Sequence, residues 1–345
     1  MKAIVKVRPE PGGLELRDLP IPKPGPNEAL IKVKVTAICG TDLHIYKWDA
    51  WSQHRLKLPR ILGHEFAGEI VEVGNAVRKF KVGDYVSGEG HLVCGFCEMC
   101  RTGQGHVCED WRGLGYDCDG SFAEYLVLPE ANLWRYHPDV KPEIAAIHDP
   151  LGNAVHAVFA ADCVAKKVVV FGCGPVGVLA VAVLKAIGAA QIIALERGNQ
   201  YRMNLARKAG ATHVLNDIDL DDVPAAIRRI TGGKGADVAI EIAGSPAAVQ
   251  DAVRCIHPGG HTVLMGIPNQ RIDFDVAEDI VFKAITIHGI TGRRIYDTWY
   301  RIAGLLQSGN LQVEELITHR FPFAEYEQGF QLMRQGDCGK VILDL

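Results

Sequence analysis

Short apolar runs alternate with longer helical segments through the second half of the chain, and this alternation restricts the fold more than any other feature. The apolar runs are residues 167–171, 191–195, 212–216, 236–242, 261–265 and 284–289. Apolar strands that alternate with helices form a parallel sheet covered on both faces. The sequence therefore predicts an α/β unit with a doubly wound parallel sheet.

A glycine turn follows the first of these runs. The residues GCGPVG, from Gly172 to Gly177, stand between the first strand and a helix. Here Gly172 allows a tight turn, Gly174 lets the backbone approach a pyrophosphate, and Gly177 lets helix and strand pack closely. The N-terminus of the helix that follows faces the anion, and Pro175 and Val176 are also expected to bind the cofactor. The motif predicts a dinucleotide site; a turn that only packs a helix is the alternative.

The next apolar run ends on an acidic residue. Glu196 comes nineteen residues after Gly177, near the spacing of a carboxylate that binds the ribose 2′-hydroxyl. This carboxylate would repel a 2′-phosphate, so NAD is favoured over NADP, although Arg197 beside it is of the type that accepts such a phosphate. After a later strand, we expect Gly266 and Ile267 to contact the nicotinamide carboxamide.

Composition and termini exclude several other classes of protein. The chain has 345 residues and a formal net charge of -4, which gives no electrostatic attraction to nucleic acid or to an anionic membrane. Its first residues alternate like a strand and contain no signal-peptide core. The uncharged run 168–184 has glycines and a proline near its start, which favour a strand, a turn and a buried helix over a membrane span. We expect a cytoplasmic protein of two domains.

The first 150 residues have the pattern of β structure. In the segment 28–37, Ile31, Val33 and Val35 alternate with Lys32 and Lys34. This period of two is typical of a half-buried strand. Further runs of this kind predict a mostly antiparallel β domain.

Four cysteines, Cys94, Cys97, Cys100 and Cys108, lie within fifteen residues of one another. In a reducing cytoplasm, clustered thiols indicate a metal rather than disulfides. Four thiolates without a carboxylate suit a closed tetrahedral zinc site, and an iron–sulfur cluster is the alternative. Because four protein ligands leave no position for a substrate, this metal would be structural.

A second set of ligand types is scattered along the chain at Cys39, His64, Glu65 and Asp149. Cysteine, histidine and carboxylate together are the pattern of a catalytic zinc that keeps one position open. The alternative is that Cys39 is a core residue and His64 an ordinary hydrogen-bonded histidine.

These motifs resemble the zinc-dependent medium-chain alcohol dehydrogenases from end to end of the chain. The resemblance is carried by the sequence GHE at residues 63–65 with Gly68, by CGTD at 39–42, by the four-cysteine lobe and by the glycine turn. Longer segments are similar to the branch of that family that oxidises L-threonine. They are residues 36–53, 88–91, 149–156, 290–293 and 297–300.

The resemblance implies a fold, an assembly and a ligand set. We expect a GroES-like catalytic domain at residues 1–153 and 294–345, with a structural zinc lobe at about 89–115, and an NAD-binding Rossmann domain at residues 154–293. Two zinc ions per chain are implied. Cys39, His64 and Glu65 would hold the catalytic zinc with Asp149 or a water, and the four clustered cysteines would hold the structural zinc. A homotetramer is also implied.

The implied reaction is oxidation of the secondary hydroxyl of L-threonine to 2-amino-3-oxobutanoate. Zinc would act as a Lewis acid, and hydride would pass to the nicotinamide. We expect Thr41 to take the hydroxyl proton, His44 to relay it to solvent, and His91 to tune the substrate end of the site, unless His91 is only a loop histidine. The alternatives are a polyol or butane-2,3-diol dehydrogenase and a binding protein without turnover.

Overall fold

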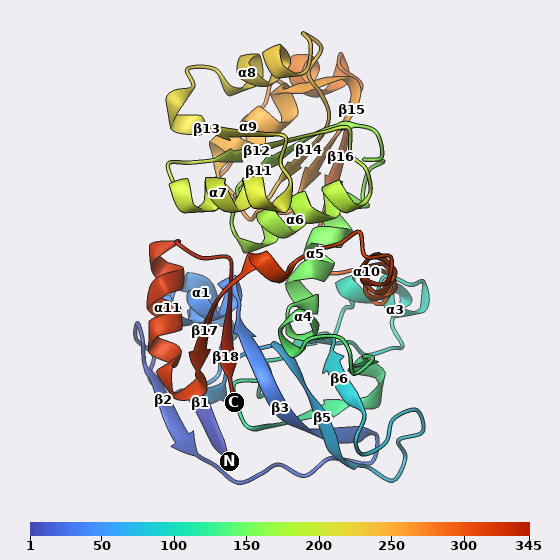
Figure 1. Cartoon of the computed structure of the whole chain (residues 1–345), viewed down its shortest axis with the longest axis vertical. Helices are drawn as coiled ribbons and strands as arrows, with labels where there is room; N and C mark the ends of the chain where they lie inside the picture. The colour runs from blue at the N-terminus through green and yellow to red at the C-terminus, as the bar shows by residue number, and fades with distance from the viewer. The chain divides into compact units, whose positions relative to one another are not determined.

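The computed structural model describes residues 1–345 and divides into two compact units. The first unit comprises residues 1–150, 317–335 and 340–345, and the second comprises residues 151–316 and 336–339. Figure 1 follows the chain through both units. None of the helices has the length and apolar character that crossing a membrane requires.

The first unit is built on antiparallel β structure, as predicted. Its largest sheet has the order β10-β6-β5-β3-β18-β17, with β9 also paired to β3, and a smaller sheet has the order β2-β1-β4. The strands are β1 (Lys2–Lys6), β2 (Leu14–Asp18), β3 (Glu28–Ile38), β4 (Arg60–Ile61), β5 (Glu65–Val73), β6 (Tyr85–Gly88), β7 (His91–Leu92), β8 (Arg112–Gly113), β9 (Tyr125–Pro129), β10 (Leu133–Arg135), β17 (Ile317–Pro322) and β18 (Lys340–Asp344). Strand β3 lies in the middle of the large sheet (Figure 1). Its Ile31, Val33 and Val35 are buried while Lys32 and Lys34 are exposed, which confirms the predicted alternation.

The helices of the first unit are short. They are α1 (Gly40–Lys47), α2 (Ala50–Arg55), α3 (Glu98–Arg101), α4 (Pro142–Ala146) and α11 (Tyr326–Gln335). Helix α4 packs on β3 and β5, and α11 packs on β17 and β18. The chain passes into the second unit within α5 (His148–Val158).

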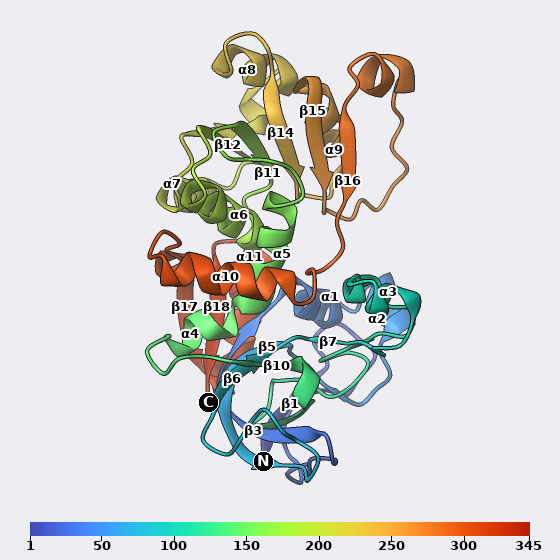
Figure 2. The same cartoon turned by 90° about the vertical axis from the view of Figure 1, so that its right-hand side faces the viewer.

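The second unit contains the predicted parallel sheet, with the strand order β13-β12-β11-β14-β15-β16. Its strands are β11 (Lys167–Phe171), β12 (Gln191–Glu196), β13 (His213–Asn216), β14 (Ala236–Glu241), β15 (Ile256–Leu264) and β16 (Thr286–Gly289), and its helices are α6 (Pro175–Ala186), α7 (Gln200–Ala209), α8 (Val223–Ile230), α9 (Pro246–Arg254) and α10 (Asp297–Gln307). Strands β14, β15 and β16 run side by side in Figure 2. The order turns back between β11 and β14, which is the switch point where ligands bind in such sheets.

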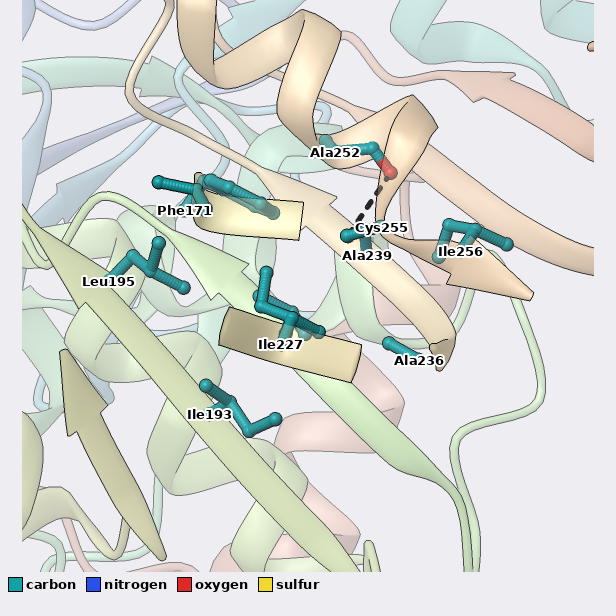
Figure 3. Packing of buried hydrophobic residues seen from close by; sticks show 11 residues of the cluster. Phe171, Ile193, Leu195, Ile227, Ala236, Ala239, Ala252, Cys255 and Ile256 are labelled. Atoms are coloured by element: carbon teal, nitrogen blue, oxygen red, sulfur yellow. Dashed lines mark hydrogen bonds between the residues drawn. The ribbon is translucent and has the colours of Figure 1, made fainter. Parts of the chain in front are cut away.

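One face of this sheet packs against α8 and α9. Figure 3 shows the buried side chains of this cluster, with Phe171 and Leu195 from neighbouring strands, Ile227 from α8 and Ala252 from α9. Helices α6 and α7 contact strands β11, β12 and β13. The helices on both faces explain why the central strands β11, β12 and β14 are mostly apolar and buried.

The compact units and the expected domains divide the chain differently after residue 293. The expected catalytic domain included residues 294–345, but residues 294–316 belong to the second unit. Helix α10 buries Trp299 and Ile302, and its Arg301 stacks over Phe159, 4.5 Å from the ring centroid. Phe159 also belongs to the second unit, so this cation–π contact joins α10 to that unit.

Candidate active site

Strand pairing brings Cys39, His64 and Glu65 together. Cys39 follows β3 and caps the N-terminus of α1, while His64 and Glu65 stand at the start of β5. The two strands are antiparallel, and Ala37 lies opposite Glu65. The end of one strand therefore meets the beginning of the other, and the three ligand atoms lie within 4.8 Å of one another.

The electrostatic environment of His64 favours a positive charge. Burial alone would lower the pKa of His64, but the neighbouring Cys39, Asp42 and Asp149 outweigh burial and raise this pKa to about 10. The Nδ1 atom of His64 is buried and has no hydrogen-bond partner. A thiol, an imidazole and a carboxylate in such surroundings fit a divalent zinc ion.

Two charged residues that the sequence analysis missed support these ligands. Asp42 accepts hydrogen bonds from the backbone N–H groups of Cys39 (2.9 Å) and Gly63 (3.2 Å). The buried Lys340 ammonium lies 2.8 and 2.6 Å from the two carboxylate oxygens of Glu65. A lysine at the start of the apolar strand β18 was the only signal in the sequence. Because 275 residues separate Lys340 from Glu65, their contact could not be read from spacing.

Asp149 lies near this cluster without belonging to the group of three. It is buried on α5, and its charge contributes to the raised pKa of His64. A Cβ atom added to Gly90 would lie 3.4 Å from both Asp149 Oδ2 and His64 Cβ, so the chain at residue 90 passes directly beside them. Asp149 therefore lies beside the cluster, and its predicted part in the ligand set stays a prediction.

The predicted proton path has one residue beside the cluster and another at the surface. Thr41 Oγ1 lies 3.9 Å from Cys39 Sγ. His44, one turn further along α1, has a side chain that is 62% exposed, and its Nδ1 lies 2.5 Å from Asp49 Oδ2. Thr41 thus lies beside Cys39 and the His44 ring is exposed to water, while their predicted roles in proton transfer stay predictions.

His91 lies on a turn built around a buried carboxylate. Glu89 is fully buried, accepts a hydrogen bond from His91 N (2.9 Å), and lies 3.4 Å from His91 Nδ1. The His91 ring meets Trp111 edge-on, with 4.8 Å between the centroids. The ring is held by its own turn and by an aromatic neighbour.

Aromatic rings extend from the metal ligands to this turn. The buried Tyr116 lies edge-on to His64, with centroids 6.5 Å apart, and also contacts Trp51 and Trp111. The Arg55 guanidinium lies 4.8 Å from the Trp111 ring centroid. These aromatic contacts could not be predicted from the sequence, because the rings come from separate segments of the chain.

The four-cysteine lobe brings all four sulfur atoms within 4.8 Å of one another. Backbone N–H groups point at the sulfurs, as from Cys97 N to Cys94 Sγ (3.3 Å) and from Cys100 N to Cys97 Sγ (3.5 Å). The N–H groups of Cys100 and Glu109 lower the pKa of Cys97 to about 6. Burial instead raises the pKa of Cys100 to about 12, so the shifts differ within the group. Four sulfur atoms in a closed group fit a tetrahedral zinc.

The glycine turn of the second unit borders a pocket of about 430 Å³. Gly172 has a positive φ of 93°, and a Cβ on Gly177 would lie 1.9 Å from Gly172 O, so both positions require glycine. A Cβ on Gly174 would meet no protein atom, which leaves space for a ligand. Of the predicted cofactor residues, the pocket lining includes Gly172, Gly174, Pro175, Val176, Glu196 and Arg197.

Glu196 is held against the glycine turn. Its Oε2 accepts a hydrogen bond from Cys173 N (2.7 Å), and its Oε1 lies 3.7 Å from the Arg202 guanidinium. Arg197 is 73% exposed, and its guanidinium lies 3.9 Å from Asp217. The contact of Arg202 with Glu196 could not be predicted, because an arginine within a helix such as α7 belongs to no recognisable motif.

Gly266 and Ile267 lie in the turn after β15. Gly266 donates a hydrogen bond to Glu241 O (3.1 Å), whereas the Ile267 side chain is 91% exposed. Neither residue lines the pocket at the glycine turn. Their predicted contact with the nicotinamide stays a prediction.

The chain matches two protein-family models. The alcohol dehydrogenase GroES-like domain matches residues 25–139, and the zinc-binding dehydrogenase model matches residues 175–308. Both matches confirm the predicted fold class of a GroES-like β domain with a Rossmann domain.

Relatives match along the whole length. An L-threonine 3-dehydrogenase from Caldanaerobacter subterraneus subsp. tengcongensis is 49% identical over 99% of this chain and 98% of its own. A zinc-binding dehydrogenase from Sinorhizobium meliloti 1021, solved with NADP, has a TM-score of 0.91 at 28% identity and covers 100% of this chain and 99% of its own. The 2R,3R-butanediol dehydrogenase from Bacillus subtilis has a TM-score of 0.89 at 30% identity with the same coverage. The chain belongs to the zinc-binding medium-chain alcohol dehydrogenases.

Proposed function

We propose that this protein catalyses the NAD-dependent oxidation of L-threonine at its secondary hydroxyl, giving 2-amino-3-oxobutanoate. The observation that carries the proposal is the cluster of Cys39, His64 and Glu65 in a chain 49% identical to an L-threonine 3-dehydrogenase. A three-ligand set of mixed type leaves a position for substrate, unlike the closed group of cysteines.

The cluster of three would hold a zinc ion, which supplies a Lewis acid to a secondary alcohol, and NAD would accept the hydride. Asp149 or a water would complete the ligand set, and the four cysteines of the lobe would hold a second, structural zinc. Thr41 is proposed to accept the substrate's hydroxyl proton, since its Oγ1 lies 3.9 Å from Cys39 Sγ. His44 passes the proton to water from its exposed position beside Asp49.

NAD is the proposed cofactor because a carboxylate occupies the ribose end of the pocket. Glu196 accepts a hydrogen bond from the glycine turn and keeps a second oxygen for a ribose hydroxyl. Arg197, which could favour a 2′-phosphate, is mostly exposed and lies near Asp217. The opposing carboxylate makes the 2′-phosphate of NADP unfavourable.

His91 is proposed to line the substrate end of the site. Its backbone and ring are both fixed by Glu89, and Trp111 closes the other side of the ring. An amino-acid substrate carries an ammonium and a carboxylate, so a polar residue at a fixed position would orient it. We also propose a cytoplasmic homotetramer, supported by resemblance to the family and testable by light scattering.

A diol dehydrogenase is the second candidate function. The structural similarity to 2R,3R-butanediol dehydrogenase at 30% identity favours it, since the zinc and hydride chemistry would be the same. The two candidates differ only in whether the substrate is charged.

The deciding experiment measures NADH absorbance from zinc-loaded protein given NAD with L-threonine, butane-2,3-diol or sorbitol. We expect turnover selective for threonine, and competitive inhibition by serine. The Thr41→Val variant should lose at least about a hundredfold in kcat, the usual contribution of a positioned proton acceptor. Turnover of the diols alone would reject the amino-acid substrate, and an unchanged rate in Thr41→Val would reject the proton path.

A further inference from the structure

Glu241 is a buried carboxylic acid at the switch point of the parallel sheet. It is the last residue of β14 and is fully buried. In register it lies beside Phe171 on β11, which immediately precedes the glycine turn, and beside Leu264 on β15. The carboxyl group therefore sits where the strands that flank the cofactor pocket end.

The contacts of Glu241 join two turns of the chain. Its Oε1 accepts a hydrogen bond from Gly244 N (2.7 Å), in the turn that leads into α9. Its backbone carbonyl accepts from Met265 N (2.9 Å) and Gly266 N (3.1 Å), in the turn after β15. Its Oε2 is buried and has no hydrogen-bond partner. One residue thus fixes both turns and keeps one polar atom unsatisfied.

These two turns are packed too closely to adjust independently. A Cβ atom on Gly266 would lie 2.3 Å from Gly244 N and 2.5 Å from Glu241 Oε2. A Cβ on Gly244, which has a positive φ of 70°, would lie 3.0 Å from Ile267 N. A change of charge at Glu241 is therefore felt directly by both turns.

Burial is what makes this charge change accessible near neutral pH. It raises the pKa of Glu241 to about 7, although the N–H groups of Gly244 and Ala243 act in the opposite direction. No charged side chain contributes to this pKa. Two ionisable groups of the neighbouring elements are paired: Cys173 in the glycine turn donates to Leu195 O, and Glu196 on β12 accepts from Cys173 N. Asp251 on α9 lines the same pocket, and burial raises its pKa to about 6, below that of Glu241.

We propose that Glu241 is a positioning residue of the cofactor site and that it takes up a proton when the dinucleotide binds. A bound pyrophosphate would place negative charge at the glycine turn, which directly follows Phe171, and this charge favours the neutral acid over the carboxylate. Cofactor affinity therefore falls as the pH rises through neutrality. The inference rests on the proposed function only in taking NADH as the ligand.

The test titrates zinc-loaded protein with NADH by fluorescence, without threonine, from about pH 6 to about pH 8.5. A rise of one unit in the pKa of Glu241 on binding weakens affinity by up to about tenfold over this range. We expect a Kd that rises several-fold in the wild type and less than about twofold in Glu241→Gln. Calorimetry at about pH 7 in two buffers of different ionisation enthalpy should show proton uptake only in the wild type.

Asp237→Asn is the matched control, since Asp237 is on the same strand, accepts a hydrogen bond from Lys167 N, and lies at the opposite end from Glu241. This variant should keep the wild-type pH dependence. If Glu241→Gln folds poorly, Glu241→Met, which also has no ionisable group at this position, should lose the pH dependence of NADH binding in the same way. A pH dependence retained in Glu241→Gln would overturn this inference alone. Absence of NADH binding at any pH would overturn the proposed function as well.

Discussion

At the scale of single residues, the buried ion pair between Lys340 and Glu65 supports one of the predicted metal ligands. Both side chains are buried, and the Lys340 ammonium also donates to the backbone carbonyl of Ile38 (2.9 Å). Removing one partner of a buried pair leaves the other charge without compensation, which costs about 3–5 kcal/mol. Lys340→Met should therefore lower the free energy of unfolding by about that amount and reduce zinc at the cluster.

Chemical denaturation and elemental analysis of the purified variant measure both effects. Lys340→Arg is the control, because it keeps a positive charge and should lose much less stability. A Lys340→Met variant with wild-type stability and zinc content would show that the pair is dispensable.

The ligands themselves could be predicted from the sequence because each belongs to a short motif. Cys39 lies in CGTD and His64 with Glu65 in GHE, so a local pattern was sufficient. Lys340 and Tyr116 could not be predicted in this way, since their roles depend on contacts between segments far apart in the chain. A short sequence motif identifies the ligands, whereas the residues that hold those ligands in place are brought together only by tertiary packing.

At the scale of elements, the four-cysteine lobe depends on its metal for order. Its helix α3 has four residues, none of them buried, and the following turn buries only Gly105. Such a segment cannot offset its conformational entropy by apolar burial, so metal binding has to supply the stabilisation. Cys97→Ser should reduce zinc from two ions per chain to one and make the lobe a site of rapid proteolysis.

Cys118→Ser is a matched control for this prediction. Cys118 lies close by in sequence but outside the group of four, and it contacts the backbone carbonyl of Gly113. Its replacement should leave two zinc ions and the proteolysis rate unchanged. Loss of zinc in both variants would indicate general unfolding rather than loss of a ligand.

Element boundaries were less predictable than element types. In the sequence, Ser245 with the proline after it predicts a helix start, and Gly259 with Gly260 predicts the end of that helix. The start agrees with α9, but the predicted end is wrong. Helix α9 ends at Arg254, and these glycines lie within β15. The register of β15 against β14 is irregular there, and a Cβ on Gly260 would lie 2.3 Å from Ile256 Cγ2. The glycines thus serve an irregular strand, which in sequence has the same signal as a helix end.

At the scale of the whole molecule, the two-unit architecture could be predicted from the sequence, because the strands of the two units have different patterns of polarity. Alternating polarity predicted the antiparallel sheet, and uniformly apolar strands predicted the parallel one. The unit to which residues 294–316 belong could not be predicted from the sequence. The pattern of an amphipathic helix such as α10 does not reveal which core the helix packs against. Family resemblance assigned it to the first domain, whereas its buried Trp299 and Ile302 lie in the second unit.

The two metal sites of one chain should respond differently to chelation. The cluster at Cys39 has three protein ligands, and the lobe has four thiolates held by backbone N–H groups. A chelator can bind directly at an open coordination position, whereas four thiolates around a metal leave no such position and slow its removal. Treatment with dipicolinate should remove one zinc ion per chain and abolish alcohol oxidation, while the lobe keeps its metal and its resistance to protease. Added zinc should restore activity because the lobe remains folded. Simultaneous loss of both ions, or activity that survives the first loss, would contradict the assignment of separate catalytic and structural roles.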